Sequence, residues 1–200
     1  MNLDKKYLLN VMTSGEAAID AINQNKFGKT FFHLGPPRDT SLFEKQKNNK
    51  TEIEKCDFIL CTGLFDNHED DLSYYKNFLK EHISKKLICT NPDLTVHRGN
   101  IEELCAGSVA KVFEELGGKV IYYGKPYKEV YNKCFDKGEK VLAIGDNLRT
   151  DIKGANNLNI DSIFITEGVH RQEIGDSTKL DALLTKYKVK TNFFQKELTW

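Results

Sequence analysis

Two short apolar runs, residues 58–62 and 86–90, constrain the fold of this chain more than any other feature. Both are rich in Ile, Leu and Cys, as expected for strands that are buried on both faces of a sheet. The stretch between them carries apolar residues at helical spacing, from Leu72 to Ile83. A strand, a helix and a second strand in this order predict a βαβ unit, and therefore an α/β protein with a parallel sheet.

The alternation of strands and helices continues toward the C-terminus. Apolar runs at residues 120–123, 141–144 and 162–165 predict further strands, and residues 193–194 suggest a final short strand or a docked tail. Stretches with helical spacing separate these runs. A division into two α/β units is expected near residues 104–107.

The composition excludes several classes of function. The 29 basic and 29 acidic residues cancel, so no electrostatic argument favours nucleic acid or an anionic membrane as a partner. No apolar run approaches the length of a transmembrane helix, and the N-terminus lacks an apolar signal core. The five cysteines form no C-x-x-C pair, which favours reduced, buried thiols and a cytoplasmic protein.

The run at 141–144 leads into an acidic turn. Gly145 permits a sharp turn, and Thr150 is the predicted N-cap of the following helix. Asp146 and Asp151 therefore follow the carboxyl end of a strand, where open α/β sheets bind their ligands. Carboxylates there suit a hard cation such as Mg2+. The alternative is that Asp146 closes a turn and Asp151 supports the N-terminus of the helix.

Two further positions have candidate polar residues. Residues 91–98 offer an amide, a carboxylate, an imidazole and a guanidinium directly after a predicted strand, in a ligand-facing loop or an ordinary turn. Lys125 lies in a strand-to-helix turn, where it could present its ammonium to an anion or remain a surface lysine.

Ser14 is better explained as part of a helix N-terminus with Thr13 than as a nucleophile, because no partner base is evident.

Three motifs together, in this order, resemble the haloacid-dehalogenase-like (HAD) phosphatase superfamily. They are Asn91-Pro-Asp93, Gly124-Lys-Pro126 and Gly145-Asp-Asn-x-x-x-Asp151. Within the superfamily, the set is similar to subfamily IIA, which includes nucleotidase and nitrophenylphosphatase-like enzymes with an α/β cap domain.

The resemblance implies a fold and a set of roles. Residues 1–14 would be a remnant of the core, 15–104 the class IIA cap, and 105–200 the C-terminal half of a Rossmann-like core with parallel strands. The implied Mg2+ site comprises Asp146, Asn147 and Asp151. Lys125 would neutralise the phosphoryl group, with Asp151 as the acid that orders the site. The implied substrate-facing residues of the cap are Asn91, Asp93, His97 and Arg98.

The sequence departs from the family in one important respect. Members use the first aspartate of an Asp-x-Asp motif as the nucleophile, and the 200 residues contain no two aspartates at that spacing. The serine/threonine motif of the second core strand has no match either. We therefore expect a chain that is inactive alone and a strand at 141–144 with exposed apolar side chains. We also expect a core half of low stability and a cap that folds by itself.

The expected partners follow from this interpretation. They are a small phosphorylated substrate and either the missing N-terminal segment as a separate chain or a second copy in a homo-oligomer, with neither nucleic acid nor membrane. One alternative is a non-catalytic module that binds a phosphorylated small molecule or a partner chain. Another is an unrelated nucleotide binder, against which the absence of G-x-G-x-x-G and G-x-x-x-x-G-K-[ST] counts.

Overall fold

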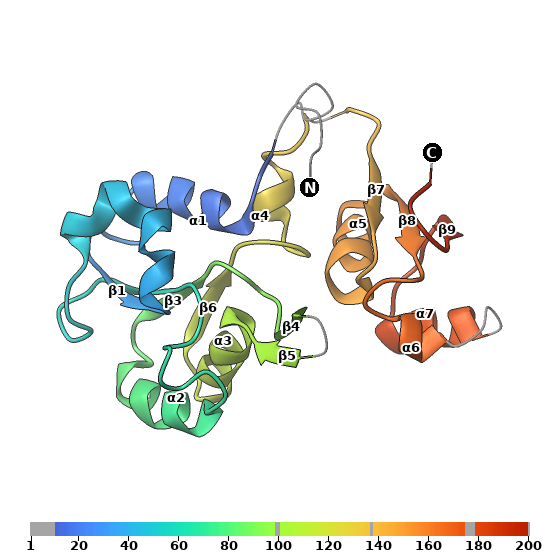
Figure 1. Cartoon of the computed structure of the whole chain (residues 1–200). Helices are drawn as coiled ribbons and strands as arrows, with labels where there is room; N and C mark the ends of the chain where they lie inside the picture. Colours follow the sequence, from blue (N-terminus) through green and yellow to red (C-terminus); the bar gives the residue numbers. More distant parts are fainter. Residues whose placement is uncertain (1–10, 99–100, 137, 175–178, 200) are drawn as a thin grey trace. The chain divides into compact units, whose positions relative to one another are not determined.

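The computed structural model describes residues 11–98, 101–136, 138–174 and 179–199. The chain divides into two compact units, Met1–Gly124 and Lys125–Trp200 (Figure 1). This division lies beyond the boundary at 104–107 that the sequence suggested. The reason is that the helix and strand after residue 105 pack with the first unit. Part of the predicted core remnant, residues 1–10, lies outside the described residues.

Strands and helices alternate through most of the two units. The first unit contains α1 (Ser14–Asn23), β1 (Phe31–Leu34), η2 (Pro37–Asn49), β2 (Phe58–Cys61), α2 (Leu72–Leu79), η3 (Lys80–His82), β3 (Lys86–Cys89), β4 (Thr95–Arg98), β5 (Ile101–Leu104), α3 (Ala106–Glu115) and β6 (Lys119–Tyr122). The second contains α4 (Lys128–Tyr131), β7 (Leu142–Gly145), η4 (Leu148–Ile152), α5 (Lys153–Leu158), β8 (Asp161–Ile165), α6 (Arg171–Ile174), α7 (Leu180–Tyr187) and β9 (Phe193–Gln195).

The first unit is built on a four-stranded parallel sheet in the order β1-β2-β3-β6. The predicted βαβ unit is confirmed, since β2 and β3 pair in parallel with Ile59 opposite Leu87. β6 joins the same sheet by pairing with β3, with Val120 opposite Leu87. This pairing places β6 in the first unit, although the expected boundary at 104–107 assigned this strand to the second unit.

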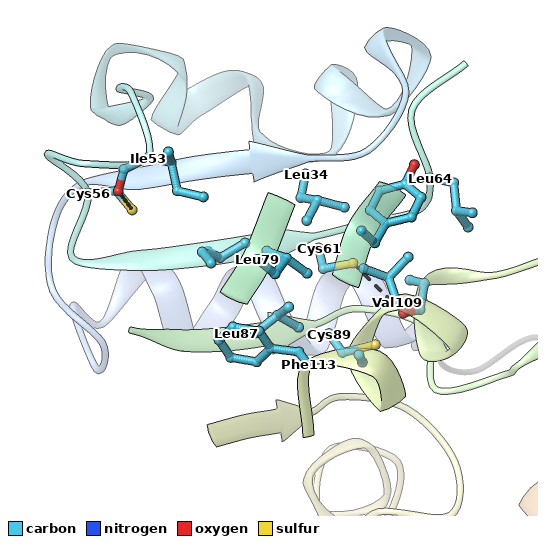
Figure 2. Close-up of a cluster of buried hydrophobic side chains, with 14 residues drawn as sticks. Leu34, Ile53, Cys56, Cys61, Leu64, Leu79, Leu87, Cys89, Val109 and Phe113 are labelled. Carbon is cyan, nitrogen blue, oxygen red and sulfur yellow. Dashed lines mark hydrogen bonds between the residues drawn. The ribbon is translucent and has the colours of Figure 1, made fainter. Parts of the chain in front are cut away.

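Helices cover both faces of this sheet. On one face, α2 and α3 bury a cluster that includes Ile59, Leu87 and Phe113, all fully buried (Figure 2). The opposite face lies under α1 and η2, where Phe31 packs edge-on against Phe43 at 5.1 Å between ring centroids. Burial on both faces explains why the strands are almost entirely apolar in sequence.

A hairpin departs from the loop that the sequence predicted. β4 and β5 pair antiparallel as a separate two-stranded sheet, with His97 opposite Glu102 and Arg98 opposite Ile101. Asn91 and Asp93 remain in the loop between β3 and this hairpin. The candidate residues 91–98 are therefore divided between a loop and a strand.

The second unit holds a three-stranded parallel sheet in the order β7-β8-β9. Its buried core forms around Phe164, which packs with residues of η4 and α7 such as Leu148 and Leu183. Within the described residues, β7 pairs only with β8. The expected exposure of apolar side chains on this strand is confirmed, because Leu142 is 47% and Ile144 41% exposed.

The helix start after β7 differs in detail from the sequence prediction. Asn147, not Thr150, caps the helical segment after β7, because its side-chain oxygen accepts the Arg149 N–H at 2.9 Å. Thr150 is instead buried inside η4. The last helix, α7, is described from Leu180. No helix in the described part of the chain combines the length and apolar character needed to cross a bilayer.

Candidate active site

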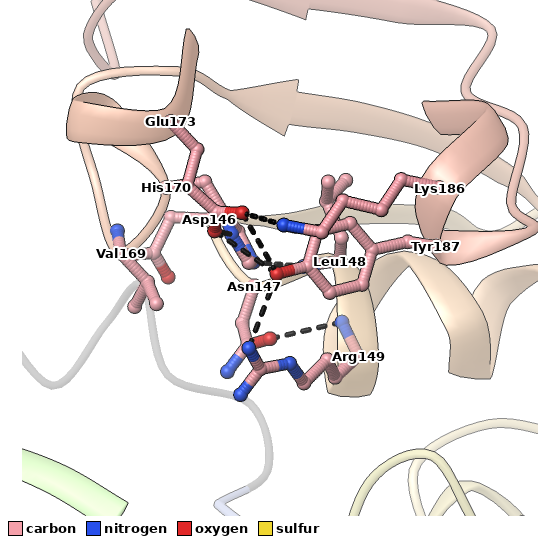
Figure 3. Close-up of polar contacts among 9 residues, drawn as sticks. All are labelled: Asp146, Asn147, Leu148, Arg149, Val169, His170, Glu173, Lys186 and Tyr187. Atoms are coloured by element: carbon pink, nitrogen blue, oxygen red, sulfur yellow. Dashed lines mark hydrogen bonds and ion pairs between the residues drawn. The ribbon is translucent and has the colours of Figure 1, made fainter. Parts of the chain in front are cut away.

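The acidic turn follows the carboxyl end of β7, as predicted. Asp146 directly follows the strand, and its Oδ2 accepts the backbone N–H of Val169 at 3.0 Å (Figure 3). Gly168 permits this approach, since a Cβ at that position would overlap the Asp146 carboxylate. Asp146 is therefore held between its own strand and the loop after β8.

Asp151 is the buried acid of the turn. It is 8% exposed, and its two oxygens serve different partners. Oδ1 accepts from the Lys125 ammonium at 2.5 Å, and Oδ2 accepts the Asn147 N–H at 3.1 Å. Gly145 allows the carboxylate to lie against the strand end, because a Cβ there would overlap Asp151. Asp151 therefore connects the predicted phosphoryl lysine to the backbone of the turn.

Lys125 forms one ion pair and is otherwise largely exposed to solvent. Its side chain is 54% exposed, and its ammonium forms an ion pair with Asp151. An ammonium has three N–H donors, so those not used by Asp151 remain available to an anion. Within the second unit, the structure thus brings Lys125, Asn147 and Asp151 into contact, with Asp146 next to Asn147 at the end of β7.

The side chains of the turn differ in their fit to a hard cation. Asp146 has one oxygen, Oδ1, that accepts no hydrogen bond from the described residues, and carboxylate oxygen is the donor type that Mg2+ prefers. Asp151 and Asn147 already use their oxygens for the lysine and the helix cap. The described residues contain no cluster of three or more His, Cys, Asp or Glu suited to a metal. The turn fits a Mg2+ ion held by Asp146 and completed by other oxygen ligands.

The cap-side candidates lie in the first unit. Asn91 accepts the Asp93 N–H with its side-chain oxygen at 3.2 Å, so the loop closes on itself. Both residues line a cavity of about 710 Å3. The other acidic residues of the lining are Asp39, Asp66, Glu69, Asp70, Glu102 and Glu103. Arg38 is the basic residue of that lining, and it pairs with Asp66 at 2.7 Å. The cavity wall therefore carries an excess of negative charge.

A polar network behind the acidic turn was missed at the sequence level. His170, Glu173, Lys186 and Tyr187 form a chain of hydrogen bonds, and His170 contacts the backbone of Leu148 (Figure 3). The His-x-x-Glu spacing at 170–173 gave a local signal, because it places the two side chains on one side of a helical turn. The contact with Leu148 spans 22 residues and has no local signal.

The buried thiols fit the structural role expected of them. The five cysteines are free, and Cys61 and Cys89 lie opposite each other in β2 and β3. Burial raises the pKa of the Cys89 thiol to about 12 and that of Cys61 well above its usual value. Such thiols remain protonated and are poor nucleophiles.

Comparisons with known proteins identify the fold family. Residues 122–187 match the HAD-hydrolase-like family model. A stretch of 96 residues is 31% identical to the ribonucleotide monophosphatase NagD of Escherichia coli (strain K12). The match covers 46% of this chain and 38% of that relative, so it spans less than half of either protein.

Solved structures extend the similarity over most of the chain. A haloacid dehalogenase-like hydrolase from Brucella suis 1330 superposes with a TM-score of 0.76 at 29% identity, covering 84% of this chain and 66% of that one. A 4-nitrophenylphosphatase from Thermotoga maritima gives a TM-score of 0.66 at 27% identity, covering 94% and 69%. Together with the acidic turn and its lysine, these similarities show that the chain resembles the haloacid-dehalogenase-like hydrolases, and that its structural neighbours include a 4-nitrophenylphosphatase.

Proposed function

We propose that this chain supplies the Mg2+- and phosphoryl-binding part of a phosphatase that acts on small phosphate monoesters through a phospho-aspartate. The observation that carries the proposal is the turn after β7, where Asp151 fixes Lys125 beside the strand end that bears Asp146. These residue types match the needs of phosphoryl transfer, which depends on positioning and on neutralising charge at the phosphoryl oxygens.

Each residue of the turn has a distinct task in this proposal. Asp146 offers its Oδ1 to Mg2+, which when bound neutralises phosphoryl oxygens and aligns them for in-line attack. Lys125 donates to a phosphoryl oxygen with the N–H groups that Asp151 leaves available. Asn147 caps η4 and so holds the turn in shape. Asp151 holds both the lysine and the Asn147 amide.

The Asp-x-Asp motif that carries the nucleophile in the family is absent from the 200 residues. They contain no Asp-x-Asp, so a phospho-aspartate route needs a carboxylate from outside them. We infer that the chain alone does not turn over substrate, and that a segment bearing the motif restores activity. The same absence favours a second candidate, a module that binds a phosphorylated small molecule or a partner chain without turnover.

We also propose that the first unit is the cap that selects the substrate, with Asn91, Asp93, His97 and Arg98 facing it. The cavity that Asn91 and Asp93 line supports this proposal, because it gives the first unit a place that could hold part of a substrate. Its acidic wall disfavours a second anionic group on that substrate. The part of the ester beyond the phosphate is therefore expected to be neutral or cationic. A cytoplasmic location remains a prediction from the reduced thiols.

Hydrolysis of p-nitrophenyl phosphate with Mg2+ tests the proposed function. The chain is assayed alone and with a second polypeptide that carries the Asp-x-Asp strand of a related phosphatase. We expect turnover only with the second polypeptide, and its loss in Asp146→Ala. The matched control is Asp161→Ala, which removes an exposed carboxylate from β8 in the same unit.

Three outcomes distinguish the possibilities. Turnover by the chain alone that Asp146→Ala abolishes would refute the need for an outside nucleophile but support the metal role. Turnover that survives Asp146→Ala would refute the assignment of the turn. Binding of the ester analogue without turnover under any condition would favour the binding module.

A further inference from the structure

A buried histidine contacts the back of the acidic turn. His170 is 1% exposed, and its Nε2 lies 3.2 Å from the backbone nitrogen of Leu148 (Figure 3). A backbone N–H can only donate, so Nε2 must be the acceptor and the ring proton must be on Nδ1. Nδ1 in turn lies 2.6 Å from Glu173 Oε1 and donates to it. The two contacts select one tautomer and one orientation of the ring.

Glu173 is held as a carboxylate that can accept this proton donor. Its pKa is lowered to about 2, chiefly by the hydrogen bond from Lys186 and also by those from His170 and Tyr187. The Lys186 ammonium lies 2.5 Å from Oε2, and the Tyr187 hydroxyl 2.9 Å from Oε1. A continuous series of bonds therefore runs from α7 through Glu173 and His170 to Leu148.

The Leu148 amide is one of three consecutive backbone donors in the turn that side chains satisfy. Asn147 N–H is accepted by Asp151, and Arg149 N–H by the Asn147 side chain. Those two acceptors belong to the turn itself, whereas the acceptor for Leu148 comes from the loop after β8. Leu148 is fully buried, so its amide would lose its partner without His170, which is costly for a buried donor.

The loop after β8 also contacts the opposite side of the same turn. Val169, next to His170, donates its N–H to the Asp146 carboxylate at 3.0 Å. Adjacent residues of one loop thus fix both the side chain of Asp146 and the backbone two residues after it. Displacement of His170 would move the Val169 amide, and with it the orientation of the carboxylate.

We propose that His170 is a positioning residue for the Mg2+-binding carboxylate of Asp146, acting through the Leu148 amide, and that Glu173 fixes its tautomer. The inference rests on the proposed function of Asp146 as a Mg2+ ligand. His170 has no contact with the metal in this assignment and transfers no proton. Partners of this kind behind a metal ligand typically contribute 10–100-fold in metal affinity.

The test measures Mg2+ affinity and amide exchange in the full chain. Titration calorimetry gives the Mg2+ dissociation constant, and NMR hydrogen exchange without metal reports the Leu148 amide. We expect His170→Ala to weaken Mg2+ binding by about 10-fold or more and to speed exchange at Leu148. His170→Gln, whose side-chain oxygen can take the place of Nε2, should restore much of both. Glu173→Gln should weaken binding less than His170→Ala.

The matched control is His33→Ala in the first unit. His33 is also buried, at 4% exposure, and it also forms a side-chain hydrogen bond, to Thr62 at 2.9 Å. We expect this variant to keep the Mg2+ affinity within about twofold, since this histidine is also buried but belongs to the other unit. If His170→Ala fails to fold, His170→Gln and Glu173→Gln still provide the comparison.

The outcomes separate this inference from the proposed function. Failure of the unaltered chain to bind Mg2+ would overturn both. Equal Mg2+ affinity in the unaltered chain and in His170→Ala, with faster exchange at Leu148, would overturn the positioning role alone. An equal loss of affinity in His33→Ala would also overturn it, because the effect would then be a general loss of stability.

Discussion

Replacement of Asp151 by Asn is expected to destabilise the second unit by about 2–3 kcal/mol. The buried carboxylate accepts from the Lys125 ammonium at 2.5 Å and from the Asn147 N–H at 3.1 Å. Hydrogen bonds to charged groups contribute about 1.5–3 kcal/mol each. Because the Lys125 side chain is 54% exposed, its bond is counted at about 1 kcal/mol or less. The side chain of the Asp151→Asn variant would keep one acceptor oxygen, but its NH2 group would face either the Lys125 ammonium or the Asn147 N–H, both of which are donors.

Urea unfolding followed by hydrogen exchange and peptide mass spectrometry measures the two units separately. The Asp151→Asn change should lower the free energy of unfolding reported by peptides of Lys125–Trp200 and leave those of Met1–Gly124 unchanged. Asp161→Asn is the control, because Asp161 is exposed and its carboxylate accepts a hydrogen bond from the exposed side chain of Asn192. Its effect should stay within about 0.5 kcal/mol. Equal effects of the two substitutions would refute the reasoning.

Three further changes test other parts of the structure. Glu173 has its pKa lowered to about 2 from 4.5, so its contribution to stability is present above pH 4.5 and lost as the pH falls toward 2. The free energy of unfolding of the second unit should therefore fall less with decreasing pH in Glu173→Gln than in the unaltered chain. Parallel pH dependences of the two proteins would contradict this. Phe113→Ala should cost the first unit about 3–5 kcal/mol in urea unfolding, because the ring is fully buried, and a loss below 1 kcal/mol would contradict the packing. Gly168→Ala should weaken Mg2+ binding in calorimetry about 10-fold, because the added Cβ overlaps Asp146; unchanged affinity would show that the turn relaxes freely.

Sequence patterns predicted most strands of the two sheets as continuous apolar runs, which burial on both faces explains for β2 and β3. The runs at residues 58–62 and 86–90 became β2 and β3, and their parallel pairing followed from the helix between them. The acidic turn was also predictable, since a strand end, a glycine and two aspartates are local features. The structure brings Lys125 to Asp151 as the motif order implied.

Features that depend on distant contacts were not predictable in the same way. The strand at Lys119–Tyr122 was expected to belong to the second unit but pairs with β3 of the first, because nothing local indicates which sheet a strand joins. The β4–β5 hairpin mixes polar and apolar residues without strict alternation and lies outside the core sheets, so its sequence gave no strand signal. Asn147 and Thr150 are both good capping residues, and only the turn geometry selects the first.

In the described residues, β7 pairs on one side with β8, and its other side sets geometric requirements for the complementing polypeptide proposed above. A parallel strand added there would lie about 4.8 Å away, with its carboxyl end at the same edge as Gly145. The residue just after that strand would then lie beside Asp146. A complementing segment must therefore be about four residues of parallel strand, apolar where it meets Leu142 and Ile144, with its carboxylate immediately beyond the last paired residue. Length, direction and register together give a criterion by which candidate partner sequences can be screened before any assay.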